Sequence, residues 1–263
     1  MKRVLVKIGG TLLDDTASRR RLCGEIASVA ASGVPLVVVH GGGKQMTRYL
    51  AEHGIESRFV NGLRVTTPET IDAVLKVFAG SVNHELVASL NGAGAPAVGL
   101  TGIDARLTEA EQLDPALGAV GRVKASNTGL LEVLTAKGYL PVVACVAADR
   151  AGNIYNVNAD QMAAACAAAF RVSQLIFLTD VAGVLDTSQR VCPVLTVAEG
   201  RALIASGVAM GGMQAKLNAA LAALEAGVEE VRIAPGAADR VLSRILEGEA
   251  LGTRLAPSEV TAR

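Results

Sequence analysis

Two apolar segments in the first part of the chain end directly in glycines. Arg3–Ile8 and Leu36–His40 have the apolar character of buried strands. The first is followed by Gly9 and Gly10, and the second by Gly41, Gly42 and Gly43. A glycine turn between a strand and a helix presents bare backbone N–H groups, and the missing Cβ atoms let a phosphate approach them. The two turns therefore predict an anion site, and we expect the fold to bring both to one phosphoryl group.

Two lysines lie in places where a positive charge needs an explanation. Lys7 is inside the first predicted strand, and a buried ammonium group is costly without an anionic partner. Lys216 follows Gly211 and Gly212 in the first turns of a helix expected from Met213, where a cation opposes the helix dipole. A bound anion would offset both costs. Without such an anion, Lys7 would be a lysine of an edge strand that reaches solvent, and Lys216 would be an ordinary exposed lysine.

Polar residues alternate in the segment Asn156, Asn158 and Asp160. In extended backbone the three side chains would project to one side. Local roles are the alternative, because Asn158 can cap the alanine-rich helix that follows and an acid in its first turn suits the dipole. Asp180 ends another predicted strand, where α/β sheets place ligands, although loop aspartates also stabilise turns.

Arg64 follows Asn61-Gly62, a strong signal for a β-hairpin. An arginine on a hairpin is either a solvated charge or a bidentate clamp for a carboxylate. Two glycine turns, two lysines and one aspartate together fit a site for phosphoryl transfer, which requires mainly positioning and charge neutralisation.

Composition and missing motifs narrow the function further. The 25 basic and 25 acidic residues balance and no basic face stands out, so we expect no nucleic-acid partner. No signal peptide and no membrane span are evident, which predicts a cytoplasmic protein without membrane contact. The four cysteines and three histidines lack metal-site spacing. A Walker A loop, protein-kinase motifs and a G-x-S-x-G element are absent.

Two other classes remain as alternatives at this stage. A Rossmann-type dehydrogenase is disfavoured because Met46 stands where the third glycine of its fingerprint belongs, and His40 stands where an acidic residue is expected. A non-catalytic binding module would not need two lysines aimed at one anion.

Strand and helix patterns alternate with short links along the chain, which predicts an α/β fold: a mainly parallel sheet between two helix layers. We expect one continuous sheet with two lobes, residues 1–173 and 174–263. A long helix is expected from Pro68 to Leu90, capped by Thr67, and the tail Leu251–Leu255 is expected to add a strand at the sheet edge.

With these residues laid out, the sequence resembles the amino-acid kinase family and, within it, the acetylglutamate kinases. The resemblance covers nearly the whole chain and rests on six segments in a fixed order: residues 7–10, 40–43, 61–66, 156–160, 178–184 and 211–216. It implies an open three-layer αβα sandwich of about eight central strands.

The resemblance also implies an activity. The γ-phosphoryl of MgATP would be transferred to the side-chain carboxylate of N-acetyl-L-glutamate, in arginine biosynthesis. An N-succinylglutamate or an aminoadipate derivative is the alternative acceptor. The lobe 1–173 would bind the acyl amino acid and form the dimer, and the lobe 174–263 would bind ATP. Mg²⁺ would be held mainly by phosphate and water, without a protein ligand.

The roles of individual residues follow from the resemblance. Lys7 and Lys216 would neutralise the transferring phosphoryl group, and Asp160 would hold both ammonium groups. The amides of Gly10 and Gly42, with Gly9, Gly41 and Gly43, would bind phosphoryl oxygens. The acceptor site would comprise Gly42, Gly43, Arg64, Asn156 and Asn158, with Arg64 on the α-carboxylate. The nucleotide site would comprise Asp180, Gly183, Gly211 and Lys216.

Two features depart from the family pattern. The segment Ala79–His84 lacks two lysines that relatives often have there. The chain begins at its first strand, whereas hexameric relatives inhibited by arginine carry an extra N-terminal helix. We therefore expect a homodimer without arginine feedback, joined through the helix Pro68–Leu90.

Overall fold

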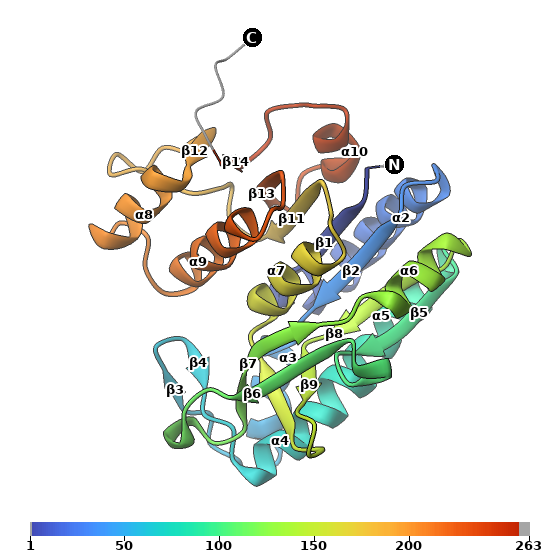
Figure 1. Ribbon diagram of the computed structural model, residues 1–263, viewed down its shortest axis with the longest axis vertical. Coiled ribbons are helices and arrows are strands. Elements are labelled where there is room, and N and C mark those ends of the chain that lie inside the picture. The colour runs from blue at the N-terminus through green and yellow to red at the C-terminus, as the bar shows by residue number, and fades with distance from the viewer. Residues whose placement is uncertain (1, 258–263) are drawn as a thin grey trace.

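The computed structural model describes residues 2–257 and contains one large open sheet of eight strands (Figure 1). Their order is β12-β14-β13-β11-β1-β2-β8-β5. The strands are β1 (Val4–Ile8), β2 (Leu36–His40), β5 (Ala97–Thr101), β8 (Leu140–Ala144), β11 (Gln174–Thr179), β12 (Val194–Thr196), β13 (Glu230–Pro235) and β14 (Thr253–Ala256). Neighbouring strands run parallel except β13 and β14, so the predicted mainly parallel sheet is confirmed.

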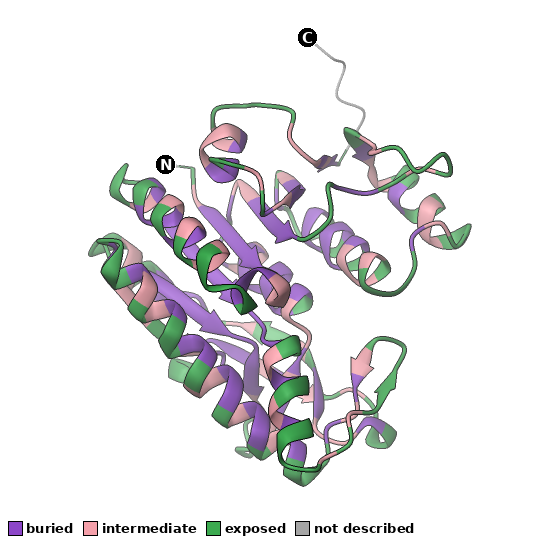
Figure 2. Ribbon diagram, turned by 180° about the vertical axis from the view of Figure 1, so that it is seen from behind, coloured by how far each residue is buried: buried purple, intermediate pink, exposed green. Residues whose placement is uncertain are grey.

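Helices cover both faces of this sheet, which explains why every residue of β1, β2 and β8 is buried. One layer includes α2 (Thr16–Ala31), α5 (Asn83–Gly92) and α10 (Val241–Leu246), seen from the side of Figure 2. The other includes α6 (Gly129–Ala136), α7 (Ala159–Ala169) and α9 (Gly211–Glu225), seen in Figure 1. The fold is the expected three-layer αβα sandwich.

The order of the strands reverses direction beside β1. The chain passes from β1 to β2 on one side, whereas β11 and then β13 are added on the other side. In the register of the sheet, Ile8 at the end of β1 lies between His40 of β2 and Leu178 of β11. Ligands of open α/β sheets bind outside the carboxyl ends of the strands at such a reversal. The two glycine turns leave the sheet at this place.

A small closed barrel lies beyond the carboxyl end of β8. It consists of β6 (Thr108–Gln112), β7 (Val120–Ser126), β9 (Val146–Ala148) and β10 (Ile154–Val157). Two short 3₁₀ helices, η2 (Asp104–Arg106) and η3 (Pro115–Leu117), accompany it. The chain enters the barrel twice, first from β5 into β6 and later from β8 through Cys145 into β9, and it finally leaves from β10 into α7. This path places Asn156 and Asp160 near the glycine turns.

The hairpin predicted from Asn61-Gly62 is confirmed. It comprises β3 (Phe59–Val60) and β4 (Leu63–Arg64), and both turn residues have positive φ, 49° at Asn61 and 78° at Gly62. Two consecutive left-handed residues define the turn type that matches the twist of a two-residue hairpin, and Asn-Gly tolerates it best.

The predicted long helix forms with an irregular middle part. It runs as α4 (Pro68–Val74), a π-helical segment η1 (Leu75–Val82) and α5. Thr67 caps it as expected, since its hydroxyl accepts a hydrogen bond from the N–H of Thr70. The remaining helices are α1 (Gly10–Asp14), α3 (Gly43–Glu52) and α8 (Val197–Ala205). Among residues 2–257, no helix has the length and apolar character needed to cross a membrane.

Two predictions about the C-terminal part are wrong in detail. α9 begins at Gly211 and not at Met213, because Met210 is the last extended residue and Gly211, at φ 54°, already turns the chain into the helix. The tail does not form the sheet edge. β14 lies inside the sheet, because the unpredicted strand β12 adds outside it.

Candidate active site

The two glycine turns touch each other at the carboxyl end of the sheet. A Cβ atom on Gly10 would lie 3.3 Å from the backbone nitrogen of Gly43, and the Gln45 amide donates to the Gly10 carbonyl over 3.4 Å. The second turn is also tightly packed. A Cβ on Gly42 would lie 2.9 Å from the Phe78 ring, and one on Gly41 would lie 3.2 Å from Cβ of Ala159. Glycine is therefore required here by close packing.

Several backbone N–H groups of these turns are available to a ligand. Within residues 2–257, the N–H groups of Gly41 and Gly42 donate to no protein acceptor. Gly10 and Gly43 are the first residues of α1 and α3, where an N–H has no acceptor inside the helix. Gly9 differs, because its N–H donates to the carbonyl of Leu178 over 2.9 Å and so extends the pairing of β1 with β11.

The carboxylate of Asp160 joins the two lysines. Its Oδ1 lies 2.7 Å from Nζ of Lys7 and its Oδ2 lies 3.2 Å from Nζ of Lys216. Burial alone would raise the pKa of the Asp160 carboxyl, but the ammonium groups of Lys7 and Lys216 outweigh it and hold this pKa below its ordinary value. Two cations around one anion leave an excess positive charge beside the glycine turns.

Helix α7 positions this aspartate. Asn158 is its N-cap, and its side-chain oxygen accepts hydrogen bonds from the N–H groups of Asp160 and Gln161. The strand β10 ends at Val157, Asn158 is the last extended residue and α7 begins at Ala159, so the expectation that Asn156, Asn158 and Asp160 project from one extended strand is wrong. Asp160 reaches the lysines because it lies in the first helical turn, and α7 packs against β1.

Arg64 is a buried cation that lacks an acidic partner within the described residues. Its guanidinium donates to the carbonyl of Gly43 over 3.1 Å, to the Thr47 hydroxyl over 2.7 Å and to the Ser57 hydroxyl, and it stacks over the Phe59 ring at 4.6 Å. Burial lowers the pKa of Arg64. The three neutral acceptors fix its position but leave its charge free to attract a carboxylate.

Lys7, both glycine turns and Arg64 share one cavity of about 180 Å³. Its lining is completed by Phe59, Gly62, Leu63, Phe78, Val120, Cys145, Asn156, Val157, Asn158 and Ala159. The Asn156 amide donates to the Thr66 hydroxyl over 3.1 Å. Both asparagines predicted for the acceptor site therefore face this cavity. The sequence did not indicate that Phe59 and Phe78 line this cavity, because a phenylalanine is equally common in an ordinary hydrophobic core.

The residues predicted for the nucleotide lie elsewhere. Asp180 is exposed just beyond β11, and Gly183 is packed so closely that a Cβ would lie 2.7 Å from the Thr253 hydroxyl oxygen. Gly211 is exposed at the start of α9. None of the three lines the cavity of Lys7, and only Lys216 reaches toward it, through Asp160. Their nucleotide-binding role stays a prediction.

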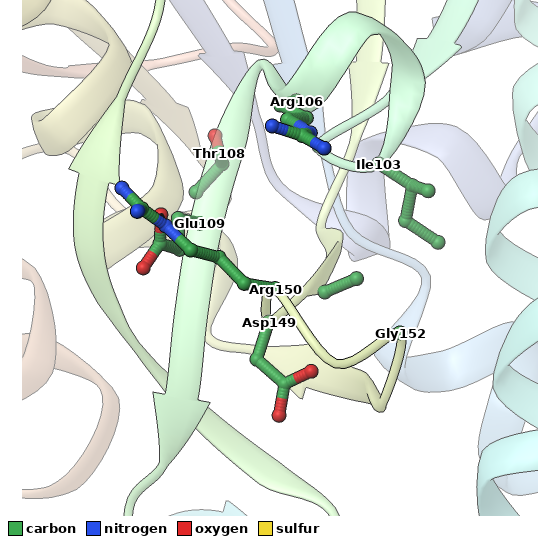
Figure 3. Close-up of a pocket in the computed structure, with 9 residues that line it drawn as sticks. Ile103, Arg106, Thr108, Glu109, Asp149, Arg150 and Gly152 are labelled. Atoms are coloured by element: carbon green, nitrogen blue, oxygen red, sulfur yellow. Dashed lines mark hydrogen bonds and ion pairs between the residues drawn. The ribbon is translucent and has the colours of Figure 1, made fainter.

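A second cavity, of about 310 Å³, lies beside the barrel and shares no lining residue with the first (Figure 3). Two of its charged side chains pair with each other, and a third is held by backbone N–H groups. Nε of Arg150 lies 2.8 Å from Glu109, and the Asp149 carboxylate accepts hydrogen bonds from the N–H groups of Ala151 and Asn153. In the part of the chain that is described, no group of three or more metal-ligating side chains occurs.

Known proteins resemble this chain along nearly its whole length. The model of the amino acid kinase family matches residues 2–235. The chain is 70% identical over 253 residues to an acetylglutamate kinase of Solibacter usitatus, covering 96% of this chain and 98% of that one. It is 42% identical over 256 residues to an acetylglutamate kinase of Koribacter versatilis, with coverage of 96% and 98%.

A solved structure shows the same arrangement. The protein smu.665 of Streptococcus mutans UA159 superposes with a TM-score of 0.84 at 27% identity, over 97% of this chain and 98% of that one. These matches extend along almost the entire chain and disfavour the Rossmann-type dehydrogenase considered above. The chain belongs to the amino acid kinase family.

Proposed function

We propose that this protein transfers the γ-phosphoryl group of ATP to the γ-carboxylate of N-acetyl-L-glutamate, forming N-acetyl-L-glutamyl 5-phosphate for arginine biosynthesis. The observation that carries the proposal is the Asp160 carboxylate between Lys7 and Lys216, beside two turns with free N–H groups. The 70% identity to an acetylglutamate kinase supports this acceptor over N-succinylglutamate or an aminoadipate derivative.

The reaction needs no general base. The γ-carboxylate, with a pKa of about 4, is ionised at neutral pH and attacks the γ-phosphorus directly. A bond forms between carboxylate oxygen and phosphorus, the bond to the bridging oxygen of ADP breaks, and ADP leaves with that electron pair. Lys7 and Lys216 offset the negative charge of the phosphoryl group, and the N–H groups of Gly10 and Gly42 donate to its oxygens.

The acceptor is held at the other groups of the cavity. The Arg64 guanidinium, which has no acidic partner within residues 2–257, binds the α-carboxylate. Asn156 and Asn158 line the same cavity and hold the acetamido group. Gly43 contributes an N–H at the start of α3. Separate anchors for the two carboxylates of one acidic amino acid fix which of them meets the phosphoryl group.

ATP binds at residues 174–263, with Asp180, Gly183, Gly211 and Lys216 in its site, and the acceptor binds at residues 1–173. Mg²⁺ enters with the nucleotide. The carboxylate of Asp160 is engaged by two lysines, and the described chain offers no cluster of acidic ligands. Phosphate oxygens and water suit the hard Mg²⁺ ion, so the residues present fit an ion carried by ATP.

The assembly we propose is a homodimer joined through the segment α4–η1–α5, in the cytoplasm. Light scattering tests the mass, and a monomer or hexamer contradicts the proposal. Fractionation of the host cells tests the location.

The reaction is tested with hydroxylamine, which converts an acyl phosphate into a hydroxamate and free phosphate. The hydroxamate is then measured as its coloured complex with iron(III). Four acceptors are compared: N-acetyl-L-glutamate, N-succinyl-L-glutamate, N-acetyl-L-aminoadipate and free L-glutamate. We expect N-acetyl-L-glutamate to have the highest kcat/KM and free glutamate to react poorly. A higher kcat/KM for the succinyl or aminoadipate compound, or no hydroxamate with any acceptor, overturns the proposal.

A further inference from the structure

A buried polar network lies directly beneath the second glycine turn. His40, the last residue of β2, is fully buried. Its Nδ1 lies 2.8 Å from the carbonyl oxygen of Gly41, and its Nε2 lies 2.9 Å from Nδ2 of Asn83. Polar groups this far from solvent are kept only with their hydrogen bonds made, so the geometry of the network is tightly constrained.

The network fixes where the proton of His40 resides. Nδ2 of Asn83 also lies 3.0 Å from the carbonyl oxygen of Val142, which can only accept. A third acceptor, the carbonyl oxygen of Leu100, is more distant at 3.5 Å. Because an amide nitrogen only donates, Nε2 of His40, the nearest of the three partners, accepts from it. The imidazole proton is then on Nδ1, from which it is donated to the carbonyl of Gly41.

This hydrogen bond sets the direction of the next N–H group. In a planar trans peptide the C=O of Gly41 and the N–H of Gly42 point in opposite directions, and the described chain has no cis peptide bond. Because the carbonyl is tied to an imidazole in the core, the N–H of Gly42 points away from the core. Gly42 lines the cavity of Lys7, and its N–H has no protein acceptor within the described residues.

The local fold makes room for Asn83 in an unusual way. Asn83 follows the eight-residue π-helical segment η1, whose extra residue per turn changes which side chain faces the sheet. Its oxygen occupies the place of a side chain at Gly99 in β5, where a Cβ would lie only 2.1 Å from it. The absence of a side chain at Gly99 thus leaves the space that the Asn83 amide occupies.

We propose that His40 and Asn83 are positioning residues for phosphoryl transfer: they hold the Gly41–Gly42 peptide so that its N–H meets the migrating phosphoryl group. This rests on the proposed kinase reaction. Burial, with the nearby Lys7 charge, lowers the pKa of His40 to about 4, so the imidazole stays neutral at physiological pH. A neutral imidazole leaves Nε2 free to accept from Asn83.

The inference is tested by comparing His40→Leu with His40→Asn. Leucine removes the donor, whereas the asparagine amide can place an N–H₂ group where Nδ1 stood. We expect His40→Leu to lower kcat about 10- to 100-fold, since one mis-aimed donor loses part of its transition-state contact. The KM values for ATP and N-acetyl-L-glutamate should stay within about threefold, because such a contact strengthens only as charge moves.

His40→Asn should recover most of the kcat that His40→Leu loses. ADP with aluminium fluoride imitates the phosphoryl group during transfer, and its inhibition should be weakened in each variant in proportion to the loss of kcat. Asn83→Leu serves if His40→Leu does not fold, and should lower kcat about tenfold because Nε2 of His40 then loses the partner that holds the imidazole ring in place. His53→Leu is the matched control, since the exposed His53 bonds a carbonyl, that of Tyr49, in the same way. We expect wild-type rates from it.

Two results overturn the inference: a kcat within twofold of wild type in His40→Leu and Asn83→Leu, or an equal loss in His40→Asn and His40→Leu. A fall in thermal stability with unchanged kcat has the same meaning, because it shows a purely structural role. Failure of the proposed function is distinguishable, since the wild-type protein would then form no hydroxamate.

Discussion

Oδ1 of Asp160 lies 2.7 Å from Nζ of Lys7, and both side chains are more than nine-tenths buried. The same carboxylate holds Lys216, so three elements far apart in sequence, β1, α7 and α9, are joined by one anion. Because one negative charge meets two positive ones, the place is attractive to a further anion. In the proposed reaction, that further anion is the phosphoryl group during its transfer.

Removing either ammonium group tests this arrangement. Lys7→Ala and Lys216→Ala should each lower kcat on the order of 10²-fold or more, because each removes a charge that acts on the phosphoryl group in the transition state. Binding of N-acetyl-L-glutamate, measured by calorimetry, should change little. Lys137→Ala, which alters an exposed lysine after α6, is the control. Turnover near the wild-type rate in either lysine variant contradicts the assigned roles.

Asp160→Asn should destabilise the protein, by about 3 kcal/mol, because it leaves two partly or fully buried cations without their anion. The effect depends on pH. The pKa of Asp160 is lower in the folded state than its ordinary 3.8, so its stabilisation is complete above that value and is lost as the pH falls through the folded pKa.

Urea unfolding at several pH values measures this dependence. The difference in free energy of unfolding between wild type and Asp160→Asn should be constant from pH 7 to about 5 and should shrink below about pH 4. Glu111→Gln, which changes an exposed carboxylate paired with Arg122, is the control and should show a much smaller difference at pH 7. A gap between wild type and Asp160→Asn that widens in acid would be inconsistent with the ion-pair geometry.

Arg64→Lys should raise the KM for N-acetyl-L-glutamate at least about tenfold and leave kcat within a few-fold. Lysine keeps the charge but loses the planar fork that binds a carboxylate in bidentate fashion, and a contact made equally in ground and transition states affects KM. The KM for ATP should not change. Initial-rate kinetics with each substrate varied in turn decide the point, and an unchanged acceptor KM places the α-carboxylate elsewhere.

Gly42→Ala should reduce kcat strongly, because the new methyl group would lie 2.9 Å from the Phe78 ring and displace the turn. Phe78→Leu should have a smaller effect by itself. The double variant should recover part of the activity, since a smaller side chain leaves room for the methyl group. A double-mutant cycle on kcat measures this coupling, and strictly additive losses would show that Phe78 is not what excludes a side chain at residue 42.

Features that depend on neighbouring residues could be predicted from the sequence. Asn61-Gly62 specifies its hairpin because only such residues accept two positive φ angles, and Thr67 caps its helix through a bond three residues away. The alternation of strands and helices was enough for the layered fold. The glycine turns and both lysines were also recognisable, because bare N–H groups and a lysine in a strand or at a helix start indicate a nearby anion. Asp160 was recognisable only through its alternation with Asn156 and Asn158, since an acid also suits the first turn of a helix.

Features that depend on contacts between residues far apart in the chain could not be predicted from the sequence. Asn83 and His40 form one network only because β2, β5, β8 and the start of α5 meet in space, and no spacing in the sequence indicates this. The π-helical segment η1 could not be predicted either, because no characteristic residue composition distinguishes a π-helical turn from an α-helical one. The position of β14 inside the sheet depends on β12, whose three residues carry too short a pattern to be read as a strand.

The place of β1 between β2 and β11 also bears on how the protein is made. During synthesis β1 emerges from the ribosome before β2, and β2 can pair with one edge of β1 soon afterwards. The opposite edge of β1 stays unpaired until β11 has been synthesised. During this interval a row of backbone groups is open to pairing with other nascent chains. We therefore expect variants that slow elongation between β2 and β11 to increase aggregation, even though the finished enzyme is unchanged.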